Sequence, residues 1–322
     1  MDATSIPSFS DAPPTTQRTL RNAIECVGIG LHSGRKVRLG LRPAPAGHGI
    51  VFRRTDLGRD IAARFDHVVD TRLCTVLADP AYESARVGTV EHVMAALSGS
   101  AIDNAVVEVD GPELPILDGS AAPFVFLIEC AGIAGLPEPR PVIEVLRTVR
   151  VEAADGGFAE IAPSSDAATE ISAEIDFADP AIGRQVRDLR LTPVQFRTDI
   201  APARTFTLLA EVEQVRAAGL ARGGSLDNAV VVDAGRVLNP AGLRMPDEFV
   251  RHKLLDMVGD LALAGAVLRA RVMASRPGHT LNNRLLRALF ADRSAWRRIG
   301  GAPHGPAGHG HKLPAAAAPL SD

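Results

Sequence analysis

The sequence predicts an α+β fold of two domains, each a β-sheet layered on α-helices. Its 322 residues are enough for about two domains of ordinary size. Each half reads as short strands followed by a helix, which favours separate layers over a regular βαβ alternation. Residues 132–141 (GIAGLPEPRP) form a Gly- and Pro-rich join between the halves. We therefore expect domain I at residues 17–138 and domain II at residues 139–299.

Strand-like runs and one apolar helical face mark the first half. The expected strands are residues 37–41, 49–53 and 105–109. Residues 89–98 (TVEHVMAALS) carry apolar side chains at i, i+3, i+4 and i+7, as in an amphipathic helix. Thr89 stands at the expected N-cap of this helix, and Gly99 stands where it would end.

In the second half, strand-like runs precede one long helix. The runs are residues 142–151, 158–162 and 170–177. Residues 247–268 are expected to form the helix, because their apolar residues lie near one stripe.

Both ends of the chain read as disordered tails, at residues 1–16 and 300–322. The first is rich in Ser, Thr, Pro and Asp, and the second in Gly, Pro and Ala. The second tail holds His304, His309 and His311. No acidic or cysteine partner accompanies them, so we do not expect a functional metal site there.

Composition excludes several classes of protein. With 35 basic and 38 acidic residues, the chain lacks the excess of positive charge that holds nucleic acid. Its 3 cysteines form no CxxC pair, which argues against a disulfide scaffold and fits a reducing compartment. We find neither an apolar run of about 20 residues nor a secretion signal. We therefore expect a soluble, cytoplasmic protein without a transmembrane segment.

The pair His252 and Asp256, four residues apart on the expected long helix, is the first candidate site. At this spacing an imidazole and a carboxylate lie on one face and can bind one metal ion. Asp260 continues the same stripe, and Lys253 lies beside it. The alternative is an exposed polar stripe with ordinary charge pairing.

Two further candidates lie elsewhere in the chain. Glu91 and His92 are adjacent on a helix, as in HExxH metalloenzymes, but Ala96 replaces the second histidine. Without other ligands, this pair is equally a polar edge of the helix. His279 follows Pro277 and Gly278, which place it in a turn, where it is either a functional group or a plain loop histidine.

Long stretches of the sequence resemble a known family. TVEHVMAALSGSAIDNAVVEVDGPELPILDGSAAPFV, LRMPDEFVRHKLLDMVGDLAL, GGSLDNAVVVD and GHTLNNRLL are similar to the zinc-dependent UDP-3-O-acyl-N-acetylglucosamine deacetylases of lipid A biosynthesis. The resemblance covers about residues 17–299 and implies two α+β domains with the active site between them. It implies that Zn²⁺ is the cofactor and that the 2-acetamido group of UDP-3-O-(3-hydroxyacyl)-N-acetylglucosamine is hydrolysed, which releases acetate.

The resemblance also implies the roles of individual residues. The zinc ligands would be His92, His252 and Asp256, and the general base would be Glu91. His279 would stabilise the oxyanion and protonate the leaving amine. Asp260 would orient His279, and Thr205 would support the oxyanion. The contacts to the nucleotide and diphosphate of the substrate would be Phe206 and Lys253.

The resemblance further implies an acyl-chain passage, which we expect in an insertion at about residues 205–232. Thr207 and Leu208 replace the Gly-Phe that the family commonly has, and Leu146 and Arg147 stand where we expect a lysine. We expect a monomer that contacts the membrane only peripherally. The competing interpretations are a hydrolase with an altered acyl preference and a catalytically inactive UDP-sugar or acyl-chain binding protein of the same fold.

Overall fold

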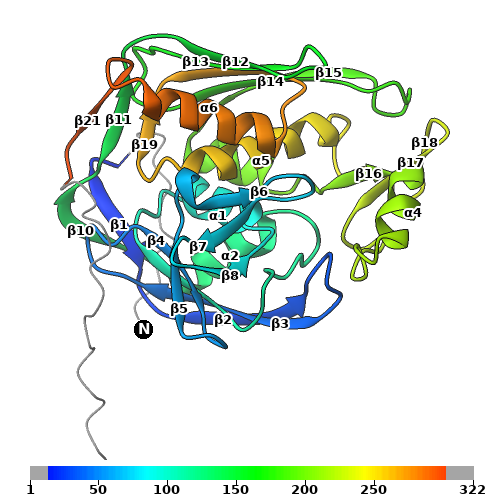
Figure 1. Cartoon of the computed structure of the whole chain (residues 1–322), viewed down its shortest axis with the longest axis horizontal. Coiled ribbons are helices and arrows are strands. Elements are labelled where there is room, and N and C mark those ends of the chain that lie inside the picture. Colours follow the sequence, from blue (N-terminus) through cyan, green and yellow to red (C-terminus); the bar gives the residue numbers. More distant parts are fainter. Residues whose placement is uncertain (1–13, 302–322) are drawn as a thin grey trace, which may run out of the picture.

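The protein forms four layers, with a sheet on each outside and helices between them (Figure 1). The computed structural model describes residues 14–301. The first main sheet has the order β2-β3-β9-β4-β5. Its strands are Ile24–Ile29, Lys36–Pro43, Ala105–Val109, Ile50–Arg54 and Arg59–Ala62. The second has the order β12-β13-β20-β14-β15. Its strands are Val149–Glu152, Phe158–Ala162, Arg271–Ser275, Glu170–Asp176 and Arg184–Arg190.

The two main sheets have the same connectivity, which the sequence did not reveal as a repeat. In each sheet one pair of strands is parallel, β4 with β9 and β14 with β20, and the other pairs are antiparallel. A helix lies in the chain between the two parallel strands, because parallel neighbours require a crossover. These crossing helices are α1 (Glu91–Gly99) and α5 (Glu248–Ala262). The two-domain α+β class is confirmed, with one crossover in each sheet.

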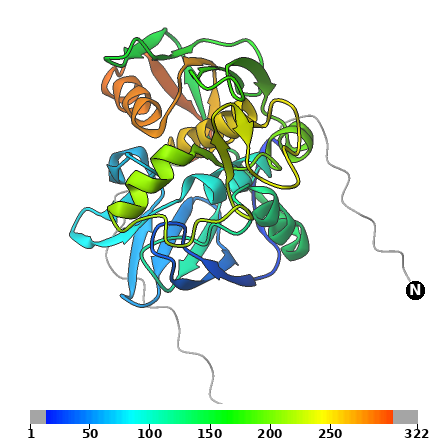
Figure 2. The same ribbon diagram turned by 90° about the vertical axis from the view of Figure 1, so that its right-hand side faces the viewer.

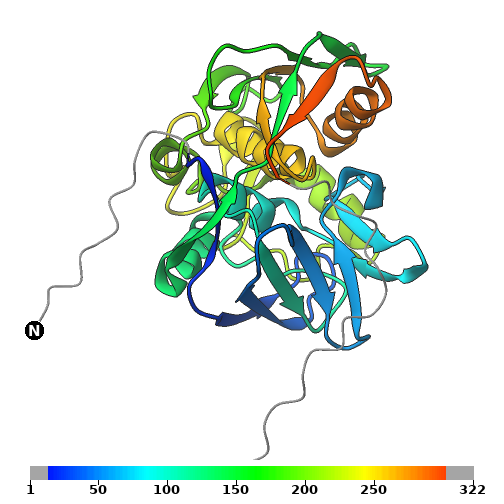
Figure 3. The same cartoon turned by 90° about the vertical axis from the view of Figure 1, so that its left-hand side faces the viewer.

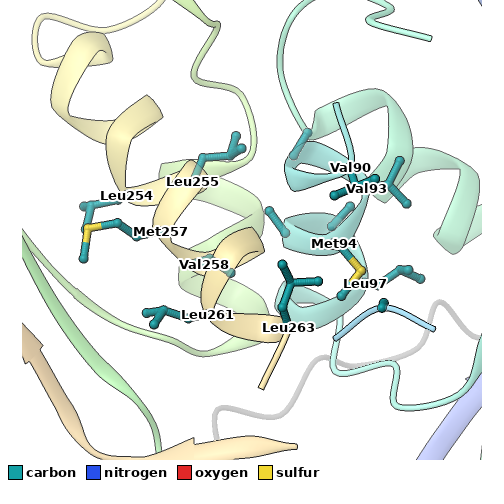
Figure 4. Packing of buried hydrophobic residues seen from close by; sticks show 14 of the residues in the cluster. Val90, Val93, Met94, Leu97, Leu254, Leu255, Met257, Val258, Leu261 and Leu263 are labelled. Carbon is teal, nitrogen blue, oxygen red and sulfur yellow. The ribbon is translucent and has the colours of Figure 1, made fainter. Parts of the chain in front are cut away.

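Helices α1 and α5 pack against each other at the centre of the molecule. A Cβ atom on Gly259 of α5 would lie 2.0 Å from the carbonyl oxygen of Glu91, so only glycine permits this approach. Leu255 points from α5 toward α1, whereas Leu254 and Met257 point away from it (Figure 4). Burial of a side chain such as Leu255 contributes roughly 1.5–3 kcal/mol, which helps to hold α1 against α5.

Each half carries an insertion between its fourth strand and its crossing helix. In the first half this is a three-stranded sheet of β6 (Val68–Asp70), β7 (Val76–Asp79) and β8 (Tyr82–Val87). The second insertion contains four elements and projects at the right of Figure 1. They are β16 (Phe206–Leu208), α4 (Leu209–Ala217), β17 (Val230–Asp233) and β18 (Arg236–Val237).

The remaining elements connect and cover the halves. Strands β1 (Thr16–Leu20) and β10 (Ile133–Pro139) pair, so most of the Gly- and Pro-rich join is strand rather than loop. A three-stranded sheet closes the side seen in Figure 3. It consists of β11 (Val142–Val145), β19 (Val267–Arg269) and β21 (Trp296–Ile299). The other helical segments are η1 (Phe65–His67), α2 (Ala122–Ala131), α3 (Pro193–Gln195), η2 (Phe196–Ile200) and α6 (His279–Ala291).

Three local predictions were wrong. Residues 142–151 are two strands, β11 and β12, because they join different sheets on either side of an exposed turn. The long helix ends at Ala262, not at residue 268, since Gly265 has φ 75° and β19 follows. Thr89 has φ 57° and is not the N-cap, a position that Val90 occupies.

The expected tails fall largely on residues 1–13 and 302–322, outside the described part of the chain, as do His304, His309 and His311. Among residues 14–301, no helix combines the length and the apolar character that crossing a membrane requires.

Candidate metal and catalytic site

The two crossing helices bring three potential metal ligands together. His92 lies in the first turn of α1, and His252 and Asp256 lie one turn apart on α5. Their ligand atoms are all within 4.8 Å of one another. The Nε2 atoms of His252 and His92 are 3.3 and 3.8 Å from Asp256 Oδ1, and all three side chains are buried. Two imidazoles and one carboxylate are a donor set typical of catalytic zinc, with a fourth position left for water.

The charge state of this cluster suits a cation. Burial and the neighbouring His252 lower the pKa of His92 to about 3, and burial also lowers the pKa of His252. Burial by itself raises the pKa of Asp256, but His252 and Lys253 outweigh it and hold that pKa well below its usual value. At neutral pH the site therefore offers two neutral imidazoles and one carboxylate, the forms that bind a metal.

His252 is also oriented by the backbone. Its Nδ1 donates a hydrogen bond to the carbonyl oxygen of Ala203 at 3.0 Å, which leaves Nε2 free to face Asp256 and His92. Within residues 14–301, Nδ1 of His92 has no such hydrogen-bond partner. The ligand from the second half is therefore held more firmly than the ligand from the first.

Glu91 lies next to the ligand cluster at the start of α1. Its Oε2 accepts a hydrogen bond from the backbone N–H of Thr75 at 3.0 Å, and its Oε1 is 3.9 Å from His279 Nε2. Burial raises the pKa of Glu91 to about 7, with His279 opposing the shift and Asp260 adding to it. A carboxylate with this pKa exchanges protons near neutral pH, as a general base must.

His279 is the first residue of α6, so it begins a helix instead of lying within a turn. Its Nδ1 donates to Asp260 Oδ2 at 2.9 Å. Burial by itself lowers the pKa of His279, but the carboxylates of Asp260 and Glu91 raise it to about 10. The imidazole is therefore protonated at neutral pH and can donate a proton or stabilise an anion.

Two residues that the sequence analysis missed hold this acid–base pair. Thr75 Oγ1 donates to Asp260 Oδ1 at 2.6 Å, so Thr75 contacts both Glu91 and the partner of His279. Asn282 Nδ2 donates to Asp260 Oδ2 at 2.9 Å. Asn282 follows His279 by one helical turn, a spacing that could have identified it, whereas no local pattern marks Thr75.

A buried ion pair fixes the segment that carries Thr205. Arg204 Nε and Nη2 lie 2.8 and 3.0 Å from the carboxylate oxygens of Glu248, and both side chains are buried. Glu248 lies one turn before His252 on α5. The Thr205 N–H donates to Gly119 O at 2.8 Å, and the Thr205 carbonyl accepts from Val230 at 2.7 Å. The backbone of Thr205 is thus held by both domains.

Phe206 and Lys253 lie beside the ligands on the side of the second insertion. The ring centroids of Phe206 and His252 are 6.3 Å apart, and Lys253 Nζ is 5.4 Å from the Phe206 centroid. Lys253 Nζ is also 3.3 Å from Asp256 Oδ2. Phe177 adds a further ring, with its centroid 5.5 Å from that of Phe206. Every residue that we predicted as a ligand, acid–base group or substrate contact therefore lies in one region.

The two departures from the family pattern leave this arrangement intact. Thr207 continues β16, and its hydroxyl donates to Glu211 in the first turn of α4. Arg147 donates to Ser294 Oγ at 2.9 Å, so its guanidinium is hydrogen-bonded to the segment between α6 and β21.

Comparison with known proteins identifies the family of the chain. The chain is 50% identical over 287 residues to a UDP-3-O-acyl-N-acetylglucosamine deacetylase of Acidithiobacillus ferrooxidans. The aligned residues cover 88% of this chain and 92% of the relative. It is 49% identical over 285 residues to the same-named protein of Myxococcus xanthus (88% and 89% covered) and 46% identical over 287 residues to that of Shewanella baltica (88% and 92% covered). The profile of one family matches residues 17–291. The chain therefore belongs to the UDP-3-O-acyl N-acetylglycosamine deacetylase (LpxC) family.

Proposed function

We propose that this protein hydrolyses the N-acetyl group of UDP-3-O-(3-hydroxyacyl)-N-acetylglucosamine, a step of lipid A biosynthesis, and that it uses Zn²⁺. The observation that carries this proposal is the buried cluster in which a three-ligand set adjoins Glu91 and His279. Membership of the deacetylase family supports the choice of substrate.

The donor set fits a zinc ion, which His92, His252 and Asp256 would hold. When bound, Zn²⁺ lowers the pKa of water from about 15.7 toward about 7 and polarises a carbonyl. These ligands would carry a single negative charge, so the ion would keep part of its positive charge.

The residues around the ligands would carry the proton transfers. Glu91 would take a proton from the attacking water as the water oxygen bonds to the acetyl carbon. Thr205 and protonated His279 would donate hydrogen bonds to the oxyanion. His279 would then protonate the amine as the C–N bond breaks, and acetate and the free amine would leave. Asp260 would keep His279 charged and oriented.

The substrate's other parts would be bound by the second domain. Phe206 and Lys253 would contact the nucleotide and diphosphate, and residues 205–232 would enclose the acyl chain. We further propose that the enzyme works as a monomer in the cytoplasm, with peripheral contact to the membrane where its lipid-tailed substrate resides. The domains would span residues 17–138 and 139–299.

Mass-spectrometric detection of deacetylated UDP-sugar, with and without a chelator, tests the proposal. We expect turnover that a chelator abolishes and that added Zn²⁺ restores. A catalytically inactive binding protein, the alternative, would bind the substrate but release no acetate. Absence of turnover in metal-loaded protein would overturn the proposal.

A further inference from the structure

A loop of the first half and a loop of the second insertion form one continuous rim, on the side that Figure 2 faces. They are residues 29–36, at the tip between β2 and β3, and residues 219–226, after α4. The N–H groups of Gly223 and Arg222 donate to the carbonyls of Leu31 and His32 at 3.0 and 3.3 Å. A Cβ on Gly223 would lie 2.3 Å from Gly30 O, so this contact requires glycine.

The rim exposes aliphatic side chains. Ile29 is 50% exposed, Leu226 is 41% exposed and Leu220 is 38% exposed. Val27, on the same face of β2 as Ile29, is also 50% exposed. Single exposed apolar residues are common, but three on two adjoining segments, with Val27 next to them, form a patch that a partner can cover.

The charges on the rim are of one sign. The charged residues within the two segments are Arg35, Lys36 and Arg222, all exposed, whereas the exposed acids Glu25 and Asp227 lie just outside them. Within the described part of the chain, these three form no ion pair. The carboxylate below them, Glu113, is buried and accepts from the backbone of His32 at 2.7 Å. The rim is thus locally cationic in a chain whose net charge is −3.

We propose that this rim docks on the surface of a bilayer that contains anionic lipids. The cations complement the lipid headgroups and the aliphatic side chains enter the interface, the two signals that together give stable peripheral binding. The inference rests on the proposed function, because an acyl-chain substrate resides in the bilayer. The rim includes part of the insertion that also supplies Phe206, so an acyl chain could pass from the bilayer toward the site without crossing water.

Sedimentation with vesicles tests the rim. The full chain is mixed with vesicles of phosphatidylcholine alone or with roughly one third phosphatidylglycerol. We expect partition onto the anionic vesicles that added salt weakens. The combined change Arg35→Gln, Lys36→Gln and Arg222→Gln should lower that partition about five-fold per cation, or about 100-fold together. Ile29→Ser with Leu226→Ser should lower it about 10-fold or more while keeping the salt dependence.

Matched controls keep the charge change and the apolar loss but move them elsewhere. These are Arg21→Gln with Arg271→Gln and Arg284→Gln, and separately Val186→Ser with Met273→Ser, all at exposed positions. We expect both controls to bind as the unmodified chain does. Failure of the unmodified chain to bind, or equal losses in the controls, would overturn the proposal.

The assay for the proposed function is independent of vesicles. Wild-type protein is given a short-chain, water-soluble substrate without lipid. Turnover without vesicle binding would refute the rim and leave the deacetylase intact, whereas binding without turnover would refute the deacetylase.

Discussion

The two halves of the molecule share a strand order but contribute differently to the site. In both, the helix that crosses between the parallel strands faces the centre. The first half offers Glu91 and His92 from the first turn of α1, whereas the second offers its ligands from the middle of α5 and His279 from α6. Duplicated connectivity therefore provides the scaffold, and the chemistry depends on how the copies differ.

The contact between the halves explains why neither is sufficient alone. Gly259 lets the backbone of Glu91 reach α5, which places His92 against His252 with ring centroids 5.1 Å apart. The proposed ligand set draws on both halves, and so does the proposed pair of base Glu91 and acid His279.

Removing one ligand from either half should have the largest effect. We expect His92→Ala and His252→Ala each to lose bound metal and to reduce turnover to background, because two remaining ligands hold Zn²⁺ weakly. Elemental analysis together with the acetate-release assay measures both quantities. Glu91→Gln is the matched comparison, since it should keep the metal while turnover falls about 10²–10⁴-fold. Full metal content after His252→Ala would contradict the ligand assignment.

Both residues of the Arg204–Glu248 ion pair lie in the second half. Its loss should therefore distinguish the contribution of the second half from that of the first. Glu248→Gln leaves the Arg204 guanidinium buried beside a neutral partner, which should lower the free energy of unfolding by about 3–5 kcal/mol. Metal affinity should fall about 10–100-fold, because the adjacent Ala203 carbonyl orients His252. Chemical denaturation and metal competition against a chelator measure these effects.

The exposed pair Arg53–Asp60 offers a control for that substitution. Asp60→Asn makes the same charge change and should alter stability by less than about 1 kcal/mol, with metal affinity unchanged. Equal effects of the two substitutions would show that the buried pair does not position His252.

Sequence patterns anticipated the local elements better than their contacts. The 3.6-residue periodicity identified the cores of α1 and α5, because each helix has a continuous apolar face. It could not reveal that α5 stops at Ala262, since that end depends on β19 pairing with β11.

The residues of the candidate site show the same difference between local patterns and long-range contacts. The motif resemblance led to His92, His252 and Asp256, which the structure brings within 4.8 Å. Thr75 remained invisible, because its role depends on a loop contact across 185 positions with Asp260 and not on any local spacing.

The pH profile compares the base of the first half with the acid of the second. The proposed mechanism requires Glu91 deprotonated and His279 protonated, so kcat/KM should rise with pH through the pKa of Glu91 and fall through that of His279, about 10. The rising limb should lie at or below about 7, because a bound cation favours the carboxylate. Asp260→Asn removes the negative charge that raises the His279 pKa. The falling limb should therefore move down by about 1–3 pH units, and the rising limb should move down by less, because Asp260 also contributes to the raised pKa of Glu91.

A falling limb that keeps its position in Asp260→Asn would assign that limb to a different group. Asn283→Ala, a substitution on the neighbouring helical position whose amide contacts Phe65 O, controls for general disturbance of α6 and should leave both limbs in place.

Asn282→Ala should have the smallest effect. It removes one hydrogen bond to Asp260 Oδ2 but retains the bond from His279 to the same oxygen and the bond from Thr75 to Oδ1. One hydrogen bond to a charged group is worth about 1.5–3 kcal/mol, and the remaining donors still hold Asp260, so we expect kcat to fall by no more than about ten-fold. We expect the loss in kcat and not in KM, since Asn282 contacts Asp260, which in turn contacts His279. A rise in KM with constant kcat would instead place Asn282 in substrate binding. The alignment of His279 through Asp260 would then depend on Thr75 of the first half.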